Sequence, residues 1–302
     1  MKISRKNFLK SSTLLFGGIL FGVHKSAAAI FQNEGGFKVL RNNIGIFTES
    51  GGTIAWYITE DAAVVIDSQM PDSAKHFLKG FEERTFRKID FLFNTHHHGD
   101  HTAGNFVLKS AAEKIVAHEN CPKLQKKAYG EGEKASMQVY ADTVFSDKWT
   151  KEIGKEKITA SYFGPAHTGG DIIIHFENAN IAHVGDIVFN NVYPFIDQNG
   201  GGSIRKWIEY LEKAEKNYDS DTTFIFGHAE SDESVTGKKK DLTEIRDYFS
   251  ALLEFVQKEI KNGKSLDEIK NVSSIPGAKD LIQRWDGARA ANIEAAFNEL
   301  KS

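Results

Sequence analysis

The segment 95–101 constrains this chain more than any other, because it places four histidines and an aspartate within seven residues. Residues 89–94, just before it, form a nearly continuous apolar run, which is typical of a strand buried on both faces. The segment reads Thr-His-His-His-Gly-Asp-His, and residues with a helical pattern follow it. A histidine-rich polar loop is the alternative interpretation, but such loops rarely carry this spacing at the end of a buried strand.

The spacing of these side chains suits two metal ions. His96 and His98 lie two residues apart, so in an extended chain they point to the same side and can bind one ion. Gly99 lets the chain turn, so that Asp100 and His101 can face a second ion. Imidazole and carboxylate ligands suit zinc, and manganese and iron also accept them.

These residues resemble the metallo-β-lactamase superfamily, and the pattern is most similar to its glyoxalase II branch. Four later family motifs occur in order: an aspartate after an apolar run, a third histidine, a metal-bridging aspartate and a last histidine. They are Asp67, His167, Asp186 and His228. The resemblance spans about residues 45–230. It implies an α/β fold, a four-layer αβ/βα sandwich with the site at one edge of its two sheets.

The resemblance also assigns the ligands of two zinc ions. The first ion would be held by His96, His98 and His167. The second would be held by Asp100, His101 and His228. Asp186 would bridge the two ions and Asp67 would brace the metal loop. Two divalent cations a few Å apart repel each other, which agrees with a bridging carboxylate between them.

Such a centre implies metal-assisted hydrolysis of a small-molecule substrate. Coordination lowers the pKa of bound water to about 7, so a bridging hydroxide would be available to attack a carbonyl carbon. Asp100 would orient that hydroxide and is therefore the candidate catalytic residue. One zinc would stabilise the oxyanion and the other would receive the leaving group. The expected substrate is an ester, thioester, lactone or lactam, and a phosphodiester stays open.

Departures from the family narrow the substrate only in part. The β-lactamase subclass with a cysteine ligand has that cysteine at the position of Asp186, followed by a substrate-binding lysine. Here residues 187–191 carry no charge, which argues against that subclass. Another β-lactamase subclass shares the histidine pattern but has a serine near Asp186. Glyoxalase II binds glutathione through basic residues of a C-terminal helical domain, for which residues 238–240 and Arg246 are candidates, although a charge run that opens a helix is usually only solvated.

Two other classes of function stay open. One is an oxidoreductase of the same superfamily, a persulfide dioxygenase with a single iron, which uses a subset of these ligands. The other is a non-catalytic periplasmic metal-binding protein. The complete ligand set, with Asp100 intact, argues against the second class.

The remaining candidate side chains are more often structural than functional at such positions. His97 alternates with the ligands and should point away from the metals. Packing or surface roles are expected for His76, His118, His175, His183 and Cys121. Three aromatic residues could line a pocket, but aromatic residues near strand ends more often belong to the core. They are Trp56, Tyr193 and Phe195.

Residues 1–29 predict a cleavable signal peptide. They contain a basic segment, a run of apolar residues and glycine at 14–23, and three alanines. Residues 4–10 resemble the twin-arginine export signal, with Lys6 in place of its second arginine. Ordinary secretion is the alternative. We therefore expect a bacterial periplasmic or otherwise exported protein that uses the twin-arginine or general export machinery and keeps no stable membrane anchor after cleavage.

The charge balance is uneven along the chain. The formal net charge is −3, but residues 1–29 carry five basic side chains and no acidic one, so the rest has 33 basic and 41 acidic side chains, a net charge of −8. An acidic chain argues against a general nucleic-acid binder. The single cysteine excludes an intramolecular disulfide.

The hydropathy pattern changes near residue 228. Before it, short β-type runs alternate with helices, and after it the pattern is helical. We expect a metallo-β-lactamase-fold domain at 30–236 and a C-terminal helical extension at 237–302, which either covers the sheet or stands apart. Strands are predicted at 54–58, 62–66, 89–94, 115–117, 158–163, 171–176, 181–184 and 222–226. Helices are predicted at 72–84, 104–112, 119–127, 203–218, 241–261 and 290–300, with a capping box at 265–268 opening one more.

Overall fold

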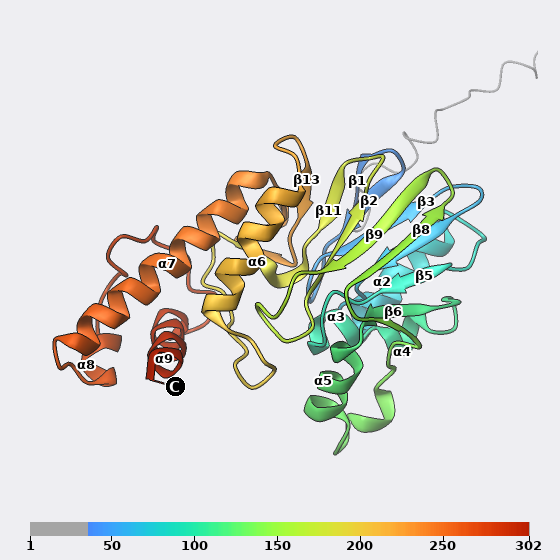
Figure 1. The fold of residues 1–302 in the computed structure, drawn as a ribbon. Helices are drawn as coiled ribbons and strands as arrows, with labels where there is room; N and C mark the ends of the chain where they lie inside the picture. Colours follow the sequence, from blue (N-terminus) through green and yellow to red (C-terminus); the bar gives the residue numbers. More distant parts are fainter. Residues whose placement is uncertain (1–35, 302) are drawn as a thin grey trace, which may run out of the picture.

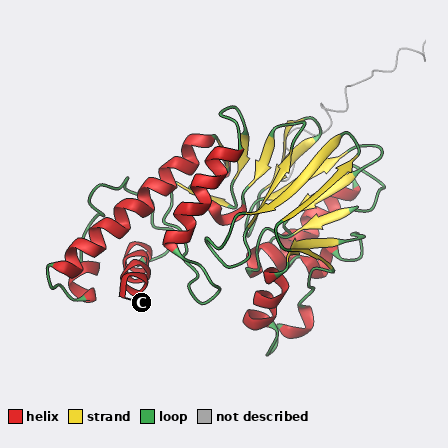
Figure 2. Ribbon diagram, in the orientation of Figure 1, coloured by secondary structure: helices red, strands yellow, loops and turns green. Residues whose placement is uncertain are grey.

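Two β-sheets packed face to face lie between two layers of helices in the computed structural model (Figures 1 and 2). The model describes residues 36–301, so the predicted signal peptide and export motif lie outside the described residues. The first sheet follows chain order: β1 (Phe37–Arg41), β2 (Ile44–Phe47), β3 (Ile54–Ile58), β4 (Ala63–Ile66), β5 (Phe91–Phe93), β6 (Ile115–His118) and β7 (Thr143–Phe145). The second sheet has the order β15 (Thr236–Gly237), β13 (Thr223–Ile225), β11 (Ile181–His183), β10 (Ile172–Phe176), β9 (Glu156–Tyr162) and β8 (Lys148–Ile153).

Strand β3 shows why these sheets are buried on both faces. Its side chains alternate between two hydrophobic cores, because successive residues of a strand point to opposite faces. Ala55 and Tyr57 belong to the core between the sheets, whereas Trp56 belongs to the core between the first sheet and its helices. Every residue of β3 is buried, and β3 pairs antiparallel with β4, which confirms the predicted hairpin.

Helices cover the outer face of each sheet. Helices α2 (Pro71–Glu82) and α4 (Asn105–Leu108) contribute to the core on the first sheet. Helices α6 (Ile204–Asn217) and α7 (Lys239–Lys261) contribute to the core on the second. The sequence of layers is therefore helix, sheet, sheet, helix, which confirms the predicted sandwich.

The helices after β15 cover α6 rather than standing apart (Figure 1). Helix α7 packs against α6, with the rings of Trp207 and Phe249 at 4.6 Å, and α9 (Ala288–Lys301) packs against α7. The short helix α8 (Leu266–Lys270) opens with the predicted capping box between Ser265 and Glu268. One continuous core joins these helices to the second sheet.

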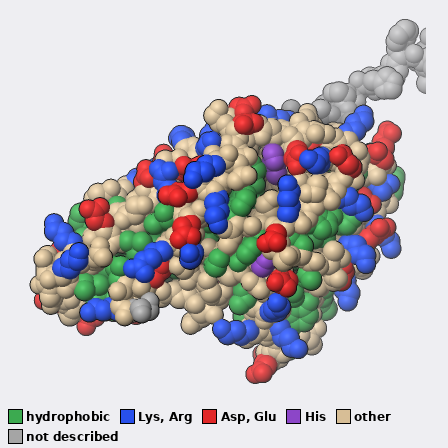
Figure 3. Space-filling model, in the orientation of Figure 1, with side chains coloured by type: hydrophobic (Ala, Val, Ile, Leu, Met, Phe, Trp, Pro, Cys, Tyr) green, Lys and Arg blue, Asp and Glu red, His purple; other side chains and the backbone are tan. Residues whose placement is uncertain are grey.

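Most predicted elements are present, with shifts of one to three residues at their ends. The helix predicted at 104–112 is wrong in its second half: α4 ends at Leu108, because the chain then returns to the first sheet, where Ala112 forms a β-bridge with Ile89. The pattern did not predict strands β1, β2, β7 and β8. Within the described residues, no helix combines the length and the apolar character needed to cross a bilayer. On the face drawn in Figure 3, side chains of both charges are interspersed.

Candidate metal centre

The seven predicted ligands lie in segments that follow or join strands at one edge of the sandwich. His96 and His98 follow β5, and Asp100 and His101 lie in the short helix α3 (Gly99–Thr102). Asp186 lies in a 3-10 turn after β11, and His228 begins the short strand β14 (His228–Ala229) after β13. His167 lies in the loop between β9 and β10. Strand β4 pairs parallel with β5 and β11 pairs parallel with β13, so the loops that follow each pair emerge at the same end.

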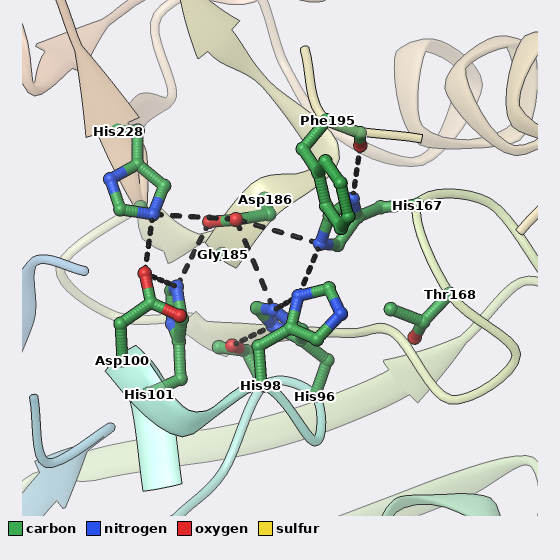
Figure 4. Close-up of polar contacts among 12 residues, drawn as sticks. His96, His98, Asp100, His101, His167, Thr168, Gly185, Asp186, Phe195 and His228 are labelled. Atoms are coloured by element: carbon green, nitrogen blue, oxygen red, sulfur yellow. Dashed lines mark hydrogen bonds and ion pairs between the residues drawn. The ribbon is translucent and has the colours of Figure 1, made fainter. Parts of the chain in front are cut away.

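Three imidazoles form the first group of ligands. The Nδ1 atom of His98 lies 3.1 Å from Nε2 of His96 and 3.0 Å from Nε2 of His167. Oδ2 of Asp186 lies 3.9 Å from Nε2 of His96 and 3.6 Å from Nε2 of His167. Figure 4 shows the rings turned toward one another below and beside this carboxylate.

An aspartate and two histidines form the second group. Oδ2 of Asp100 lies 3.0 Å from Nε2 of His228 and 3.7 Å from Nε2 of His101. The two oxygens of Asp186 again lie close, with Oδ1 3.1 Å from His101 and Oδ2 3.5 Å from His228. Asp186 therefore stands between the two groups and faces both (Figure 4).

Four of these histidines have their outer ring nitrogen bonded to an oxygen of the protein. The partners are Thr95 Oγ1 for His96 (3.0 Å), Asp197 for His98 (2.9 Å), Asp67 for His101 (2.7 Å) and the Phe195 carbonyl for His167 (2.7 Å). Each outer nitrogen donates to its acceptor, so the inner nitrogen of a neutral ring carries a lone pair. In the first group the lone pair of His98 lies 3.0–3.1 Å from those of His96 and His167, and such lone pairs repel one another unless a cation lies between them.

Two further observations fit a metal centre. Nε2 of His101 and Oδ1 of Asp186 are buried and, although 3.1 Å apart, neither makes a hydrogen bond of good geometry. Buried polar atoms without a hydrogen bond are rare in proteins, and binding of a metal ion would satisfy both. The donor set of imidazole nitrogens and carboxylate oxygens suits zinc and related transition metals. The cluster is thus a metal-binding site of the two-metal type.

Burial and mutual charge set the protonation of the ligands. Burial, followed by the neighbouring His98, lowers the pKa of His167 to about 3. Burial, followed by His101, also lowers the pKa of His96 well below its usual value. Burial would raise the pKa of Asp186, but the charges of His228 and His101 outweigh it and lower this pKa. At neutral pH His167 and His96 are therefore uncharged and can each offer a lone pair to a metal ion, whereas Asp186 is an anion.

Asp67 braces the loop as the resemblance implied. It is fully buried and accepts hydrogen bonds from the backbone and hydroxyl of Thr95 as well as from His101. Its φ angle is +63°, a left-handed conformation that costs free energy in a residue other than glycine. Gly185 also has a positive φ, of +52°, and a side chain at Gly227 would collide with Asp186. The backbone is shaped around the ligands on both sides.

Some of the other candidate side chains belong to the core or the surface, and others line the pocket described below. His97 belongs to neither group, but it is buried with Nε2 3.5 Å from Asp197 and lines the pocket rather than turning away from it. Trp56 and Tyr193 lie in the core, whereas Phe195 is half exposed and lines the pocket. The remaining residues pack or lie at the surface: His76, His118, Cys121, His175 and His183.

A pocket of about 1000 Å³ opens onto the metal centre. Several residues that line it were not predicted from the sequence, among them Asp197, Arg284 and Trp285. Asp197 stands just before a run of three glycines, a composition typical of a loop, but nothing in the pattern brings it to His98. The basic candidates Lys238, Lys239, Lys240 and Arg246 do not line this pocket. Lys238 and Lys239 donate to the backbone carbonyls of Asp221 and Tyr218, and Arg246 donates to the Glu215 carboxylate.

A four-layer sandwich with a histidine and aspartate cluster at one sheet edge defines a class of metal-dependent proteins. The chain belongs to the metallo-β-lactamase superfamily, since the model of that family matches residues 49–228, more than half of the chain. Members of this superfamily with the two groups described above hold two metal ions, and the chain is hydrolase-like in both fold and site.

Named relatives extend this comparison. The chain is 21% identical to a metallo-beta-lactamase type 2 of Elizabethkingia meningoseptica over 222 residues, 70% of this chain and 79% of that protein. It is 31% identical to a hydroxyacylglutathione hydrolase of Brucella ovis over 130 residues, 43% of this chain and 44% of that protein. The chain therefore spans less than half of the latter enzyme.

Solved structures share the fold at low identity. A metallo-beta-lactamase from Pontibacter korlensis superposes with a TM-score of 0.61 and 15% identity, over 71% of this chain and 98% of that one. The sec-alkylsulfatase Pisa1 from Pseudomonas sp. superposes with a TM-score of 0.65 and 14% identity, over 87% of this chain and 50% of that one. These likenesses concern the fold alone.

Proposed function

We propose that this protein is an exported dizinc hydrolase that cleaves an ester, thioester, lactone or lactam. One observation carries the proposal: the inner ring nitrogens of His96, His98 and His167 converge on one point while their outer nitrogens are already bonded. The similarity to a β-lactamase and to a hydroxyacylglutathione hydrolase supports hydrolysis of an acyl bond.

The residues present would hold two metal ions. The first would bind His96, His98 and His167. The second would bind Asp100, His101 and His228. Asp186 would face both. Bound zinc would supply Lewis acidity and a water molecule of lowered pKa.

Asp100 acts on the attacking water. Its side chain is 36% exposed and lines the pocket, whereas Asp186 behind it is 4% exposed. Burial would raise the pKa of Asp100, but the charge of His101 and the hydrogen bond from His228 outweigh it and lower this pKa. The ionised carboxylate of Asp100, which lies at the pocket wall, orients the water by accepting a hydrogen bond from it.

The decisive experiment combines metal analysis with a substrate panel. The metal content of the protein without residues 1–29 is measured as purified and again after loading with zinc. The loaded protein is then screened for hydrolysis of esters, thioesters, lactones and lactams. We expect two zinc ions per chain and turnover of at least one class. One iron per chain would favour the persulfide dioxygenase, and two zinc ions without turnover would favour a metal-binding protein.

Export is a separate proposal that rests on residues 1–29. A reporter that matures only outside the cytoplasm, fused after residue 29, should be active in bacteria. Replacing Arg5 and Lys6 by glutamine should abolish that activity if the twin-arginine route is used. Retained activity would indicate the general secretion route, and an inactive unmodified fusion would refute export.

A further inference from the structure

Three large apolar side chains are partly exposed around the pocket of the metal centre. Met70 is 38% exposed, Phe195 49% and Trp285 37%, and all three line that pocket. Apolar side chains gathered at a concave site generally mark a place where a ligand buries them. The pocket therefore has an apolar rim beside its charged floor.

The two aromatic rings connect this rim to the metal centre. The Phe195 ring lies 5.6 Å from the His98 ring, and it also meets the Trp285 ring at 6.4 Å with an interplanar angle of 73°. An apolar wall thus leads outward from the first group of ligands. A group placed against it would lie next to a bond that is cleaved at the metals.

Trp285 is held at the pocket by backbone hydrogen bonds. The amide of Ile282 donates to the carbonyl of Asn191 (2.9 Å), and the amide of Tyr193 donates to the carbonyl of Ile282 (3.0 Å). These bonds join the segment before α9 to the segment that carries Phe195. The rim is accordingly built from two parts of the chain that are fixed to each other.

Arg284 is the one Lys or Arg side chain among the described residues that line this pocket. Four carboxylates line it as well, but two of them belong to the ligand set, Asp197 accepts from His98, and Glu49 pairs with His76. In the described part of the chain Arg284 has no hydrogen bond or ion pair. Its guanidinium is therefore free to bind a carboxylate through two parallel hydrogen bonds.

We propose that the substrate is an acyl compound with an aryl group near the scissile bond and a carboxylate on the far side of that group. The aryl group packs against the wall that Phe195 and Trp285 form together, in the pocket that Met70 also lines, and Arg284 binds the carboxylate. This inference rests on the proposed hydrolase function and adds a substrate class to it.

Four thioesters of one neutral thiol test the inference: 4-carboxyphenylacetyl, phenylacetyl, succinyl and acetyl. We expect the first to have the highest kcat/KM, with about tenfold lost on removing either the ring or the carboxylate. Arg284→Gln should lower kcat/KM about tenfold for the carboxylated pair alone. Trp285→Ala should lower it for the aryl pair alone, and Trp285→Phe should restore most of the loss.

Matched variants outside the pocket serve as controls. Arg205 is an exposed arginine and Phe86 an exposed phenylalanine, and neither lines this pocket. Arg205→Gln and Phe86→Ala should leave all four kcat/KM values unchanged. Equal losses for all four thioesters in Arg284→Gln or Trp285→Ala would overturn the inference, because a merely structural defect is indifferent to the substrate.

A binding experiment separates this inference from the proposed function. The matching thioethers lack the carbonyl and cannot be hydrolysed, and their affinities can be measured by titration calorimetry. If no thioester is cleaved, the hydrolase proposal fails for thioesters, but the carboxyaryl thioether should still bind about tenfold more tightly than the phenyl one, with Arg284→Gln removing the difference. Equal affinities would overturn the inference whatever the outcome of the hydrolysis experiment.

Discussion

The two ligand groups of the metal centre are built differently. In the first, three imidazoles are 0–13% exposed, and the outer nitrogen of each is bonded to an oxygen of the protein. In the second, Asp100 is 36% exposed and His228 16%. His101 is fixed by Asp67, whereas within the described chain no acceptor holds Nδ1 of His228.

This difference indicates that the first group mainly binds its metal ion tightly, whereas the second group mainly exposes its ion to substrate and water. Ligands fixed in advance lose little conformational freedom on binding, so the first group should bind its ion more tightly. The second group opens to the pocket, where a substrate or water can approach. We therefore expect the first site to fill first and the second to exchange its ion more readily.

The largest expected effect comes from Asp186→Asn, which removes the charge shared by both groups. Two cations would then lack the anion between them, so we expect one metal per chain and turnover at least about a thousandfold lower. Metal analysis and kcat/KM measure the two losses. Asp219→Asn, a change at an exposed aspartate outside the pocket, is the control. Two bound ions with undiminished turnover would refute the bridging role.

A paired ligand deletion tests the asymmetry directly. His98→Ala should abolish both metal binding and turnover, because the second ion depends on a filled first site. His228→Ala should leave one tightly bound ion while turnover falls by at least about a hundredfold. Metal content after dialysis and kcat/KM distinguish the two variants. Equal metal content in both would mean that the groups do not differ in affinity.

The supporting carboxylates give a smaller and more selective effect. Asp197→Asn should weaken the first site alone by about tenfold to a hundredfold, since Asp197 orients only His98. Asp67→Asn should weaken both sites, since Asp67 orients His101 and, through Thr95, also His96. Competition with a chromophoric chelator gives both affinities. Identical affinity profiles for the two variants would contradict these separate roles.

The smallest expected effect concerns the stability of the metal-free protein in acid. Burial would raise the pKa of Asp197, but the hydrogen bond from His98 outweighs it and lowers the pKa to about 2. A lowered pKa stabilises the fold above the ordinary value near 4, and that contribution is lost as the pH falls toward 2. Between these values the free energy of unfolding should fall more in the wild type than in Asp197→Asn, by on the order of 1 kcal/mol. Urea titrations measure it, and parallel curves would contradict it.

The sequence predicted most of the inner strands, although it missed the buried strand β2, and it predicted the edge strands poorly. Strands such as β3 and β4 are buried throughout, so their apolar runs are unmistakable. Strand β8 is exposed along most of its length and contains Lys148, Lys151 and Glu152, which obscure any apolar run. Helix α4 was predicted too long, because the return of the chain to Ile89 is a tertiary contact.

The same contrast holds for the centre itself. Its seven inner residues stand in motifs with recognisable spacing, and the structure brings all seven together. The residues around them reach the site across long stretches of chain, as Asp197 does to His98 and Trp285 to Phe195. Such contacts depend on how the loops fold back, and no local sequence pattern predicts them.

The segment that carries Phe195 and Asp197 also has consequences for the order of biosynthesis. It orients His167 and His98, and it is held in turn by α9, where Asn292 donates to the Pro194 carbonyl and the Ala295 carbonyl accepts from Gln198. Helix α9 leaves the ribosome after every ligand has been made. We therefore expect the centre to reach its final form only after α9 has been synthesised, because a nascent chain that ends before α9 lacks these two hydrogen bonds.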